Sequence, residues 1–361
     1  MSRLRIAVVF GGMSSEHEVS LLSTASVLKN LSAEKYEIYP MGITKSGRWF
    51  FYPGSFDLIP TGEWELHPGC VPAVISPDSS VGGIVMMPQE GRCHIRKLDA
   101  VFPVLHGRFG EDGTIQGLFS LAGIPFVGAD TLSSAVCMDK EVANSLLDNA
   151  GIIRTPWDVI YSENIDQPDS FLDRWEELFG YPMFIKPANS GSSVGVSKAA
   201  NRESLKEAVK LAFRYDSKVL VEKAVFGKEL ECAVLGNEDP VASVVSEIAP
   251  VNEFYDYDAK YNTPSETFLP ARIDSELSKK IQETSVKAYK LLGCSGMARV
   301  DFLFDEAASI LYLNELNTIP GFTDISMYPK MTAASGIPYP RLLDRLIDLA
   351  IDKAASAKKG V

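Results

Sequence analysis

The chain has 361 residues, of which 46% are hydrophobic and 23% charged, and its formal net charge is -12. This composition is typical of a soluble globular protein of two or three domains, and the acidic balance argues against general binding to nucleic acid or to an anionic membrane surface. No run approaches the roughly 18 consecutive apolar residues of a membrane span, and the five scattered cysteines favour reduced thiols in a cytoplasmic protein over a zinc site or a disulfide framework.

The N-terminal third alternates strand and helix patterns. An apolar run at 4–10 is broken by two glycines, and the following residues carry apolar side chains at helical spacing before a second apolar run. This order predicts the start of a parallel α/β sheet. Residues 50–95 are rich in Pro, Gly and Ser, so we expect them to extend the edge of the first domain. The predicted elements are strands at 4–10, 37–43, 98–105 and 124–128 and helices at 20–31 and 115–121.

The rest of the chain predicts two further α/β units. The predicted helices cover 130–150, 168–179, 204–213, 276–292 and 340–354. The predicted strands cover 183–186, 194–197, 218–222, 229–235 and 240–246, followed by a hairpin around a turn at 305–309. We expect 229–235 and 240–246 to pair antiparallel. The predicted domains are 1–129, 130–226 and 227–361.

The segment KPANSGSSVGVSK begins at Lys186, where a predicted strand ends. Gly191 and Gly195 permit close approach of the backbone to a ligand, and a lysine fixed at a strand end can supply a charge to a phosphate. The segment is not a Walker A loop, because the lysine precedes the glycines. It predicts a phosphate-binding loop, with a mobile surface hairpin as the alternative.

Two short polar patterns occur on the predicted C-terminal hairpin. Arg299 and Asp301 alternate on one strand, and Glu315 and Asn317 alternate on its partner. Alternating residues share a face of a strand, so a hairpin in register would gather three oxygen ligands and a guanidinium. Hard oxygen donors suit Mg²⁺. The pattern predicts a metal site, and the alternative is a solvated face with one salt bridge.

Polar residues also follow the predicted N-terminal strands. Ser15 and Glu18 have the spacing of a capping box, whereas Glu16 could pair with a substrate ammonium or act only as a first-turn acid. His106 follows another strand and is, by default, a satisfied loop histidine. Gly321 could donate its N–H to an oxyanion, and the alternative is an ordinary type II turn.

These patterns occur together in one known family. The chain resembles the D-alanine–D-alanine ligases of the ATP-grasp superfamily. The matching stretches run in order over nearly the whole length: VFGGMSSEHEVS, VFPVLHGRFGEDGTIQG, CMDK, FIKPANSGSSVGVSK, LVEKAVFGKELECAVLG, EFYDYDAKY, GCSGMARVDF and LYLNELNTIPGFTDISMYPK. The resemblance implies an α/β fold of three domains, the first with a Rossmann-like parallel sheet, and ATP held between the second and third.

The resemblance also implies roles for individual residues. Glu16 would bind the ammonium of the first D-alanine, and Tyr261 would link to it through Ser192. The implied ATP contacts are Lys140, Lys186, Ser192, Ser193, Glu222, Lys223, Val225 and Glu229. The implied ligands of Mg²⁺ (or Mn²⁺, two ions) are Asp301, Glu315 and Asn317. The implied substrate contacts are Glu16, His106, Lys260, Ser326 and Met327, and the implied catalytic residues are Glu16, Ser192, Tyr261, Arg299 and Gly321.

The implied activity is ATP-dependent ligation of two D-alanines in peptidoglycan precursor synthesis, by a cytoplasmic homodimer with no nucleic-acid or membrane partner. A sister ligase that makes D-Ala–D-Ser or D-Ala–D-Lac is the first alternative. The lactate-making type departs from the AKY pattern and has Arg in place of Met327, whereas this chain keeps Lys260, Tyr261 and Met327. A nucleotide-binding regulatory module without turnover is the second alternative, and the acid-rich hairpin argues against it.

Overall fold

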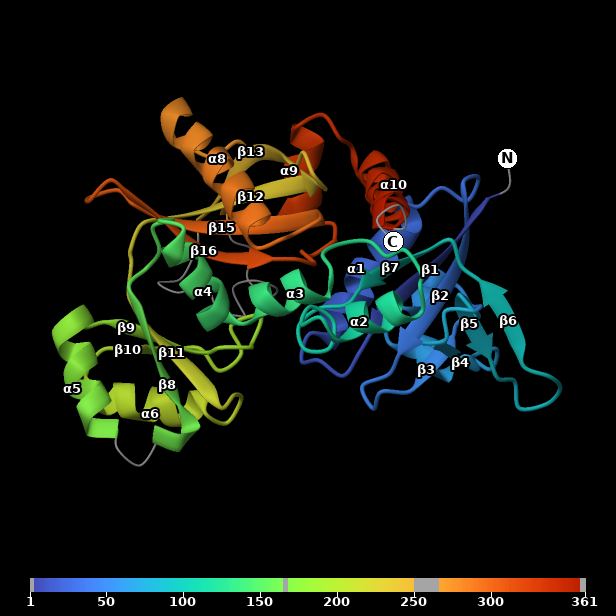
Figure 1. The fold of residues 1–361 in the computed structure, drawn as a ribbon, viewed down its shortest axis with the longest axis horizontal. Coiled ribbons are helices and arrows are strands. Elements are labelled where there is room, and N and C mark those ends of the chain that lie inside the picture. Colours follow the sequence, from blue (N-terminus) through green and yellow to red (C-terminus); the bar gives the residue numbers. More distant parts are fainter. Residues whose placement is uncertain (1–2, 165–167, 250–265, 358–361) are drawn as a thin grey trace.

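The computed structural model describes residues 3–164, 168–249 and 266–357. Within these residues the chain forms a seven-stranded, a four-stranded and a five-stranded sheet, each in a separate part of the molecule (Figure 1). The mixture of helices and sheets confirms the predicted α/β class. No helix in the described part of the chain is both long and apolar enough to span a membrane.

The first sheet combines a parallel centre with an antiparallel extension, in the order β6-β5-β4-β3-β2-β1-β7. Its elements are β1 (Leu4–Gly11), α1 (His17–Asn30), β2 (Tyr36–Ile43), β3 (Trp49–Phe51), β4 (Val71–Ile75), β5 (Gly83–Met86), β6 (His94–Lys97), β7 (Ala100–Val104) and α2 (Thr114–Leu121). β1 pairs parallel with β2 and β7, and β3 to β6 continue the sheet antiparallel. The Pro- and Gly-rich segment therefore extends the sheet edge, as predicted.

β1 is a continuous apolar run because both of its faces are covered. Ile6, Val8 and Phe10 belong to one core cluster, and Ala7 and Val9 belong to another. Strands that are buried on both faces read as unbroken apolar runs rather than as alternating ones. The first strand thus lies at the centre of its domain, with its carboxyl end free to begin a site.

Two local predictions in this part of the chain are wrong. The predicted strand at 124–128 makes only an isolated bridge between Val101 and Phe126, since Pro125 has no N–H to continue a ladder. The capping box does not form, because α1 begins at His17 and its N-cap is Glu16, which makes no side-chain cap bond. Glu18 instead contacts Lys45.

The predicted helix at 130–150 is in fact two helices, α3 (Thr131–Met138) and α4 (Lys140–Asn149). Asp139 separates them: its backbone is extended, and its carboxylate accepts hydrogen bonds from the N–H groups of Glu141 and Val142. Aspartate is among the preferred N-cap residues, so it starts a new helix here. The break places Lys140 at the first position of α4.

The four-stranded sheet has the order β10-β9-β11-β8 and a core of its own. Its elements are β8 (Trp157–Tyr161), α5 (Pro168–Phe179), β9 (Met183–Pro187), β10 (Ser197–Ala199), α6 (Arg202–Ala212) and β11 (Lys218–Lys223). The predicted strand at 194–197 begins only at Ser197, and β8 was not predicted. The buried cluster of this sheet, which includes Trp175 and Ile185, draws all its residues from these elements.

The five-stranded sheet is antiparallel, in the order β14-β13-β12-β15-β16. Its strands are β12 (Lys228–Gly236), β13 (Val241–Ala249), β14 (Glu266–Phe268), β15 (Gly296–Asp305) and β16 (Ile310–Asn317), and its helices are α8 (Ser275–Leu291), α9 (Met327–Ala334) and α10 (Tyr339–Ala357). The predicted β12–β13 pairing and the β15–β16 hairpin are confirmed, whereas α9 was not predicted.

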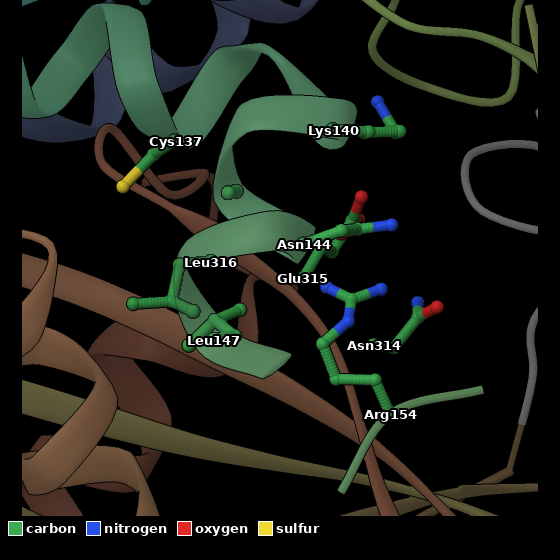
Figure 2. Close-up of a pocket in the computed structure, with 9 residues that line it drawn as sticks. Cys137, Lys140, Asn144, Leu147, Arg154, Asn314, Glu315 and Leu316 are labelled. Atoms are coloured by element: carbon green, nitrogen blue, oxygen red, sulfur yellow. The ribbon is translucent and has the colours of Figure 1, made fainter. Parts of the chain in front are cut away.

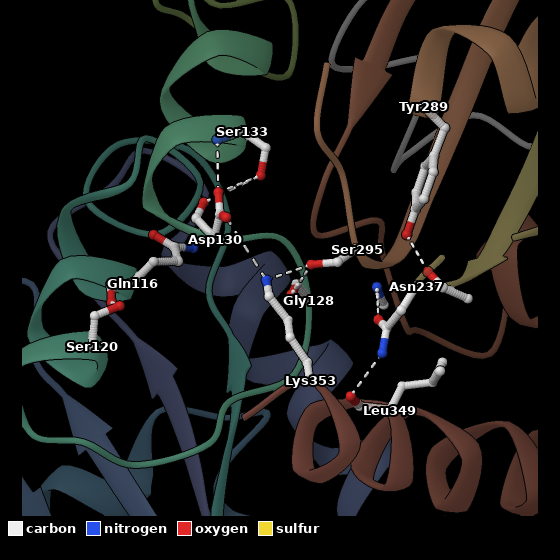
Figure 3. Close-up of polar contacts among 12 residues, drawn as sticks. Gln116, Ser120, Gly128, Asp130, Ser133, Asn237, Tyr289, Ser295, Leu349 and Lys353 are labelled. Atoms are coloured by element: carbon white, nitrogen blue, oxygen red, sulfur yellow. Dashed lines mark hydrogen bonds and ion pairs between the residues drawn. The ribbon is translucent and has the colours of Figure 1, made fainter. Parts of the chain in front are cut away.

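The first and third sheets are joined by a common core and by polar contacts. Phe102 of β7 and Leu346 of α10 lie in one buried cluster. Figure 3 shows the polar junction, in which the Lys353 ammonium lies 2.5 Å from the Ser295 hydroxyl. The Asn237 amide donates to the Leu349 carbonyl at 3.0 Å. The four-stranded sheet, with its separate core, is thus the distinct part of the molecule.

Candidate active site

The first feature of the site is a buried ion pair within the four-stranded sheet. Lys186 on β9 and Glu222 on β11 lie on adjacent strands, and their Nζ and Oε2 atoms are 2.6 Å apart. Only 17% of the Lys186 side chain and 6% of the Glu222 side chain are exposed. Burial without a partner would be costly for either charge, so each holds the other in place. The pair fixes the lysine at the start of the loop predicted to bind phosphate.

The loop that follows β9 has an unusual backbone. Ser192 and Ser193 both adopt left-handed φ angles, 47° and 59°, which non-glycine residues rarely do. The Lys140 ammonium, from the start of α4, donates to the Ser190 carbonyl at 2.6 Å. The Ser190 hydroxyl donates to the Val194 carbonyl at 2.8 Å. Strained residues of this kind concentrate at ligand-binding loops, and the contact with α4 brings the two predicted phosphate-binding lysines to the same loop.

The carboxylate of Glu16 lies against this loop although it comes from the other end of the chain. It accepts a hydrogen bond from the Ser192 hydroxyl, and Glu16 is 6% exposed. A Cβ on Gly107 or Gly191 would lie only 2.3 or 2.7 Å from Glu16 Oε2, so a side chain at either position would displace this carboxylate. Gly107 also has a left-handed φ of 68°, which favours glycine. Glu16 is therefore a buried acid at the domain junction and not a solvated first-turn acid.

A second acid, Glu111, lies beside Glu16 and was not predicted. Its carboxylate accepts a hydrogen bond from the Gly107 N–H at 2.7 Å. Burial, and then the negative charge of Glu16, raise the pKa of Glu111 to about 8. Two neighbouring buried carboxyls disfavour double ionisation, so one of them keeps a proton near neutral pH. The pair therefore holds a single negative charge here.

His106 is buried and neutral. Its Nδ1 lies 3.2 Å from the Ile319 carbonyl and its Nε2 lies 3.2 Å from the Ser23 hydroxyl. The Ser23 oxygen also accepts from the Phe322 N–H at 3.3 Å. These contacts assign the proton to Nδ1 and an accepting role to Nε2. Burial, and then the charge of Arg299, lower the pKa of His106 to about 4. His106, which follows β7, therefore connects the end of that strand to the turn after β16 through a hydrogen bond.

The polar face of the β15–β16 hairpin forms in the predicted register, with Arg299 opposite Asn317 and Asp301 opposite Glu315. The Nε and Nη2 atoms of Arg299 lie 2.8 and 2.7 Å from the two Asp301 oxygens. Burial alone would lower the pKa of Arg299, but the nearby carboxylates of Asp301 and Glu231 raise it well above its ordinary value. The guanidinium is charged and held rigidly.

Glu231 of β12 completes this face and was also missed. Its Oε1 lies 3.1 Å from Arg299 Nε, and it pairs with Asp301 across the strands. The signal in the sequence is its alternation with Glu229 in the stretch ELECAVLG, since residues two apart share a face. Glu229 itself is half-buried on β12, opposite Leu303.

The hairpin residues suit a hard divalent cation. Asp301 and Glu315 are opposite each other, and the Asn317 amide lies 3.0 Å from Asp301 Oδ2, so two carboxylates and an amide converge. No cluster of three His, Cys, Asp or Glu with metal-binding geometry occurs in residues 3–164, 168–249 and 266–357. Two carboxylates with one amide are a set that Mg²⁺ accepts, because it retains waters at its other positions. The residues fit the ion.

The remaining predicted positions lie around this centre or outside the described residues. A Cβ on Gly321 would lie 2.7 Å from Ser326 Oγ, and Gly321 does not adopt the positive φ that a type II turn requires. Met327 begins α9 and is buried.

The Lys223 N–H donates to the Pro156 carbonyl at 2.9 Å, so a ligand contact there would use the Lys223 carbonyl. Val225 is half-buried. Lys260 and Tyr261 lie outside the described residues.

Comparisons with known proteins identify the family of this chain. The family model described as D-ala D-ala ligase N-terminus matches residues 5–129, and the one described as D-ala D-ala ligase C-terminus matches residues 146–348. The D-alanine–D-alanine ligase of Thermoanaerobacter pseudethanolicus is 49% identical over 98% of both chains. That of Acetivibrio thermocellus is 49% identical over 97% of this chain and 96% of its own.

Two solved structures of ligases are also similar to this chain over nearly its whole length. The VanG D-Ala:D-Ser ligase from Enterococcus faecalis has a TM-score of 0.88 and 43% identity, and covers 97% of this chain and 100% of its own. The D-alanine–D-alanine ligase from Coxiella burnetii has a TM-score of 0.86 and 36% identity, over 99% and 98% of the two chains.

Proposed function

The chain belongs to the D-alanine–D-alanine ligase family, and from this premise we propose how its described residues carry out the ATP-dependent joining of two D-alanine molecules. The observation that carries the proposal is the charged hairpin face, where Arg299, Asp301 and Glu315 lie together. The contact between Ser192 and Glu16 supports it, because it brings the phosphate loop to the predicted ammonium site.

The reaction needs an activated carboxylate, since a free carboxylate is a poor electrophile at neutral pH. A carboxylate oxygen of the first D-alanine attacks the γ-phosphorus of ATP, the β–γ bond breaks, and ADP leaves with that electron pair. Lys140 and Lys186 neutralise the phosphate charge, and the left-handed loop at Ser192 and Ser193 covers it. Catalysis of this step rests on positioning and on charge neutralisation.

The second step forms the peptide bond. The amine of the second D-alanine attacks the acyl carbon, loses a proton, and inorganic phosphate leaves. The rigid Arg299 guanidinium and the Gly321 N–H stabilise the oxyanion of the tetrahedral intermediate. The negative charge of Glu16 holds the ammonium of the first D-alanine, and neutral Glu111 adds no second charge beside it.

Asp301, Glu315 and Asn317 would hold Mg²⁺ or Mn²⁺, two ions in all, which neutralise the charge of the nucleotide phosphates when bound. The ATP-contact assignment also includes Glu222, the backbone at Lys223 and Val225, and Glu229. His106, Ser326 and Met327 would border the amino-acid subsites. Lys260 and Tyr261 are assigned to the same subsites by resemblance alone.

For the acceptor we assign D-alanine. The relatives that are 49% identical bear the name D-alanine–D-alanine ligase. This chain also has Met327, where the lactate-making type has Arg. Incubation with equal D-alanine, D-serine and D-lactate, followed by mass analysis, should give D-alanyl-D-alanine as the main product. A mixed product rich in D-serine would reassign the acceptor.

We assign residues 1–129 to the substrate-binding domain, 130–226 to the ATP-covering domain and 227–361 to the catalytic domain. We also propose that the enzyme is a cytoplasmic homodimer, because peptidoglycan precursors are made in the cytoplasm. Light scattering of the purified chain should give twice the monomer mass of 39.5 kDa. A monomer mass would contradict the dimer.

The overall reaction is tested by product release. With ATP and Mg²⁺ present, added D-alanine should release ADP and phosphate in equal amounts with the dipeptide. If ATP binds but D-alanine causes no release of either product, the chain is a nucleotide-binding module and not a ligase.

A further inference from the structure

A small pocket between α4 and β16 carries polar side chains to which the mechanism assigns no role. Figure 2 shows its lining, with Lys140 at one end and Arg154 at the other. The lining residues are Cys137, Lys140, Ala143, Asn144, Leu147, Arg154, Asn314, Glu315 and Leu316. Two of them, Lys140 and Glu315, belong to the proposed phosphate and metal sites, so the pocket lies beside the place assigned to the ATP phosphates.

Arg154 is buried, and its side chain has no direct partner among the described residues. It is only 7% exposed, and its Nε makes no hydrogen bond within the described part of the chain. None of the ion pairs among residues 3–164, 168–249 and 266–357 involves it. In Figure 2 its guanidinium points into the pocket, toward Asn144 and Glu315. Leaving a buried charge unpaired is costly, so this arrangement calls for a ligand.

Asn144, on the facing helix α4, is also buried with an unsatisfied polar group within the described part of the chain. It is 2% exposed, and its side-chain N–H₂ group finds no acceptor among the described residues. Because it lies one helical turn after Lys140, its amide faces the same pocket. Guanidinium and amide N–H groups both donate hydrogen bonds. The ligand that satisfies them is an acceptor, and the charge of Arg154 favours an anionic one.

The surrounding carboxylates do not act as the hydrogen-bond acceptor for Arg154. Burial lowers the pKa of Arg154, and the charges of Glu222, Asp148 and Glu315 raise it. None of these carboxylates lies within ion-pair distance of it. The acids offset the effect of burial only in part, so the pKa of Arg154 is lowered, but an arginine stays protonated at neutral pH. Its N–H groups are directed into the pocket. The cavity has room for about one water-sized group, which is the size of a single phosphate oxygen.

We propose that Arg154 and Asn144 form an additional phosphate-oxygen subsite beneath the nucleotide, beside Lys140 and Glu315. This inference rests on the proposed function, since it places the phosphates of ATP or ADP above the pocket. The oxygen comes either from a nucleotide phosphate or from the inorganic phosphate that the ligation releases. Both sources present the same kind of hydrogen-bond acceptor, and the binding assay distinguishes between them.

The test compares Arg154→Met with the native enzyme by calorimetric titration of ADP, adenosine and inorganic phosphate in the presence of Mg²⁺. Affinity for ADP should fall about 10- to 100-fold, as for loss of charge-assisted hydrogen bonds, while affinity for adenosine stays within about twofold. Loss of phosphate binding together with ADP binding identifies a pocket open to the free anion. Loss of ADP binding alone identifies the nucleotide as the source.

Two further variants control for charge and for folding. Arg174→Met removes an exposed arginine of the four-stranded domain that pairs with Asp158, and it should leave ADP affinity unchanged. Asn144→Leu, which keeps the arginine, should weaken ADP about three- to tenfold. Arg154→Met without ligand should melt at the native temperature or above it, because it removes an unpaired buried charge.

A merely structural arginine, or a pocket that holds only a water, gives the opposite results. Arg154→Met would then bind ADP like the native enzyme and melt at a lower temperature, and the inference would be wrong. That outcome leaves the proposed function intact if the native enzyme still ligates D-alanine. A native enzyme that binds no ADP would refute the proposed function itself.

Discussion

Arg299 and Arg154 are both buried near β16, yet their surroundings differ. Arg299 forms a two-bond contact with Asp301 and a further contact with Glu231, so its charge is neutralised before any ligand arrives. Arg154 has no such contact within the described residues. On the proposed function, the hairpin face is preorganised for a transition state, whereas a ligand completes the pocket behind it.

The largest expected effect comes from removing the preorganised guanidinium. Arg299→Ala should lower turnover about a hundredfold or more, as does removal of one oxyanion donor in other enzymes, with a much smaller effect on ATP binding. The measurement is steady-state phosphate release together with ADP titration. Turnover near the native value would show that Arg299 does not act on the oxyanion.

The two arginines should also differ in their contribution to the free energy of unfolding. Arg299→Met should lower the free energy of unfolding by about 2–3 kcal/mol, because it leaves the Asp301 and Glu231 carboxylates without their cation. Arg154→Met should not lower it. Denaturant titration of the two variants without ligand measures both values. Equal losses of stability would contradict the difference in ion pairing between the two arginines.

A pH effect is expected from Glu111, whose folded-state pKa of about 8 exceeds its ordinary value of 4.5. Below pH 4.5 the folded and unfolded states are both protonated, and as pH rises toward 8 only the unfolded state ionises, so stability falls. Glu111→Gln should therefore gain stability relative to the native chain across this window, by up to roughly 4 kcal/mol at pH 8. Thermal melts at pH 4.5 and 8 test this, and a constant difference would contradict it.

The smallest expected effect concerns the loop. Ser192→Ala removes the hydroxyl that contacts Glu16 and should lower turnover about three- to tenfold, while ADP binding changes little. Ser190→Ala is the matched control, because the Ser190 hydroxyl donates to the loop's own backbone. A larger loss of turnover in the control would show that loop shape, and not the contact with Glu16, limits catalysis.

The sequence predicted those parts of the fold and site that depend on local pattern. Alternation placed Arg299, Asp301, Glu315 and Asn317 on one face, and the register confirms it. Residues whose role depends on distant partners were missed. Glu111 acts through Glu16, and no spacing in the sequence reveals that the two acids meet.

The missed and wrong elements have similar physical causes. Ser15 has the spacing of a cap, but the helix begins at His17 with Glu16 as its N-cap, and only the fold decides that position. Asp139 divides the predicted helix because its cap bonds outweigh the continuous helical pattern around it. Arg154 gave no signal, since an isolated arginine is ordinarily exposed and its burial results from the chain passing beside β16.

The central claim is that Asp301 and Glu315, brought opposite each other by the hairpin, bind the metal that accompanies the nucleotide. Electron paramagnetic resonance of Mn²⁺ titrated into the enzyme with ADP tests it directly, with Asp301→Asn and Glu315→Gln as variants. We predict that the native enzyme binds Mn²⁺ in an ADP-dependent manner and that each variant binds it at least about tenfold more weakly. Native-like Mn²⁺ binding by both variants would contradict the account.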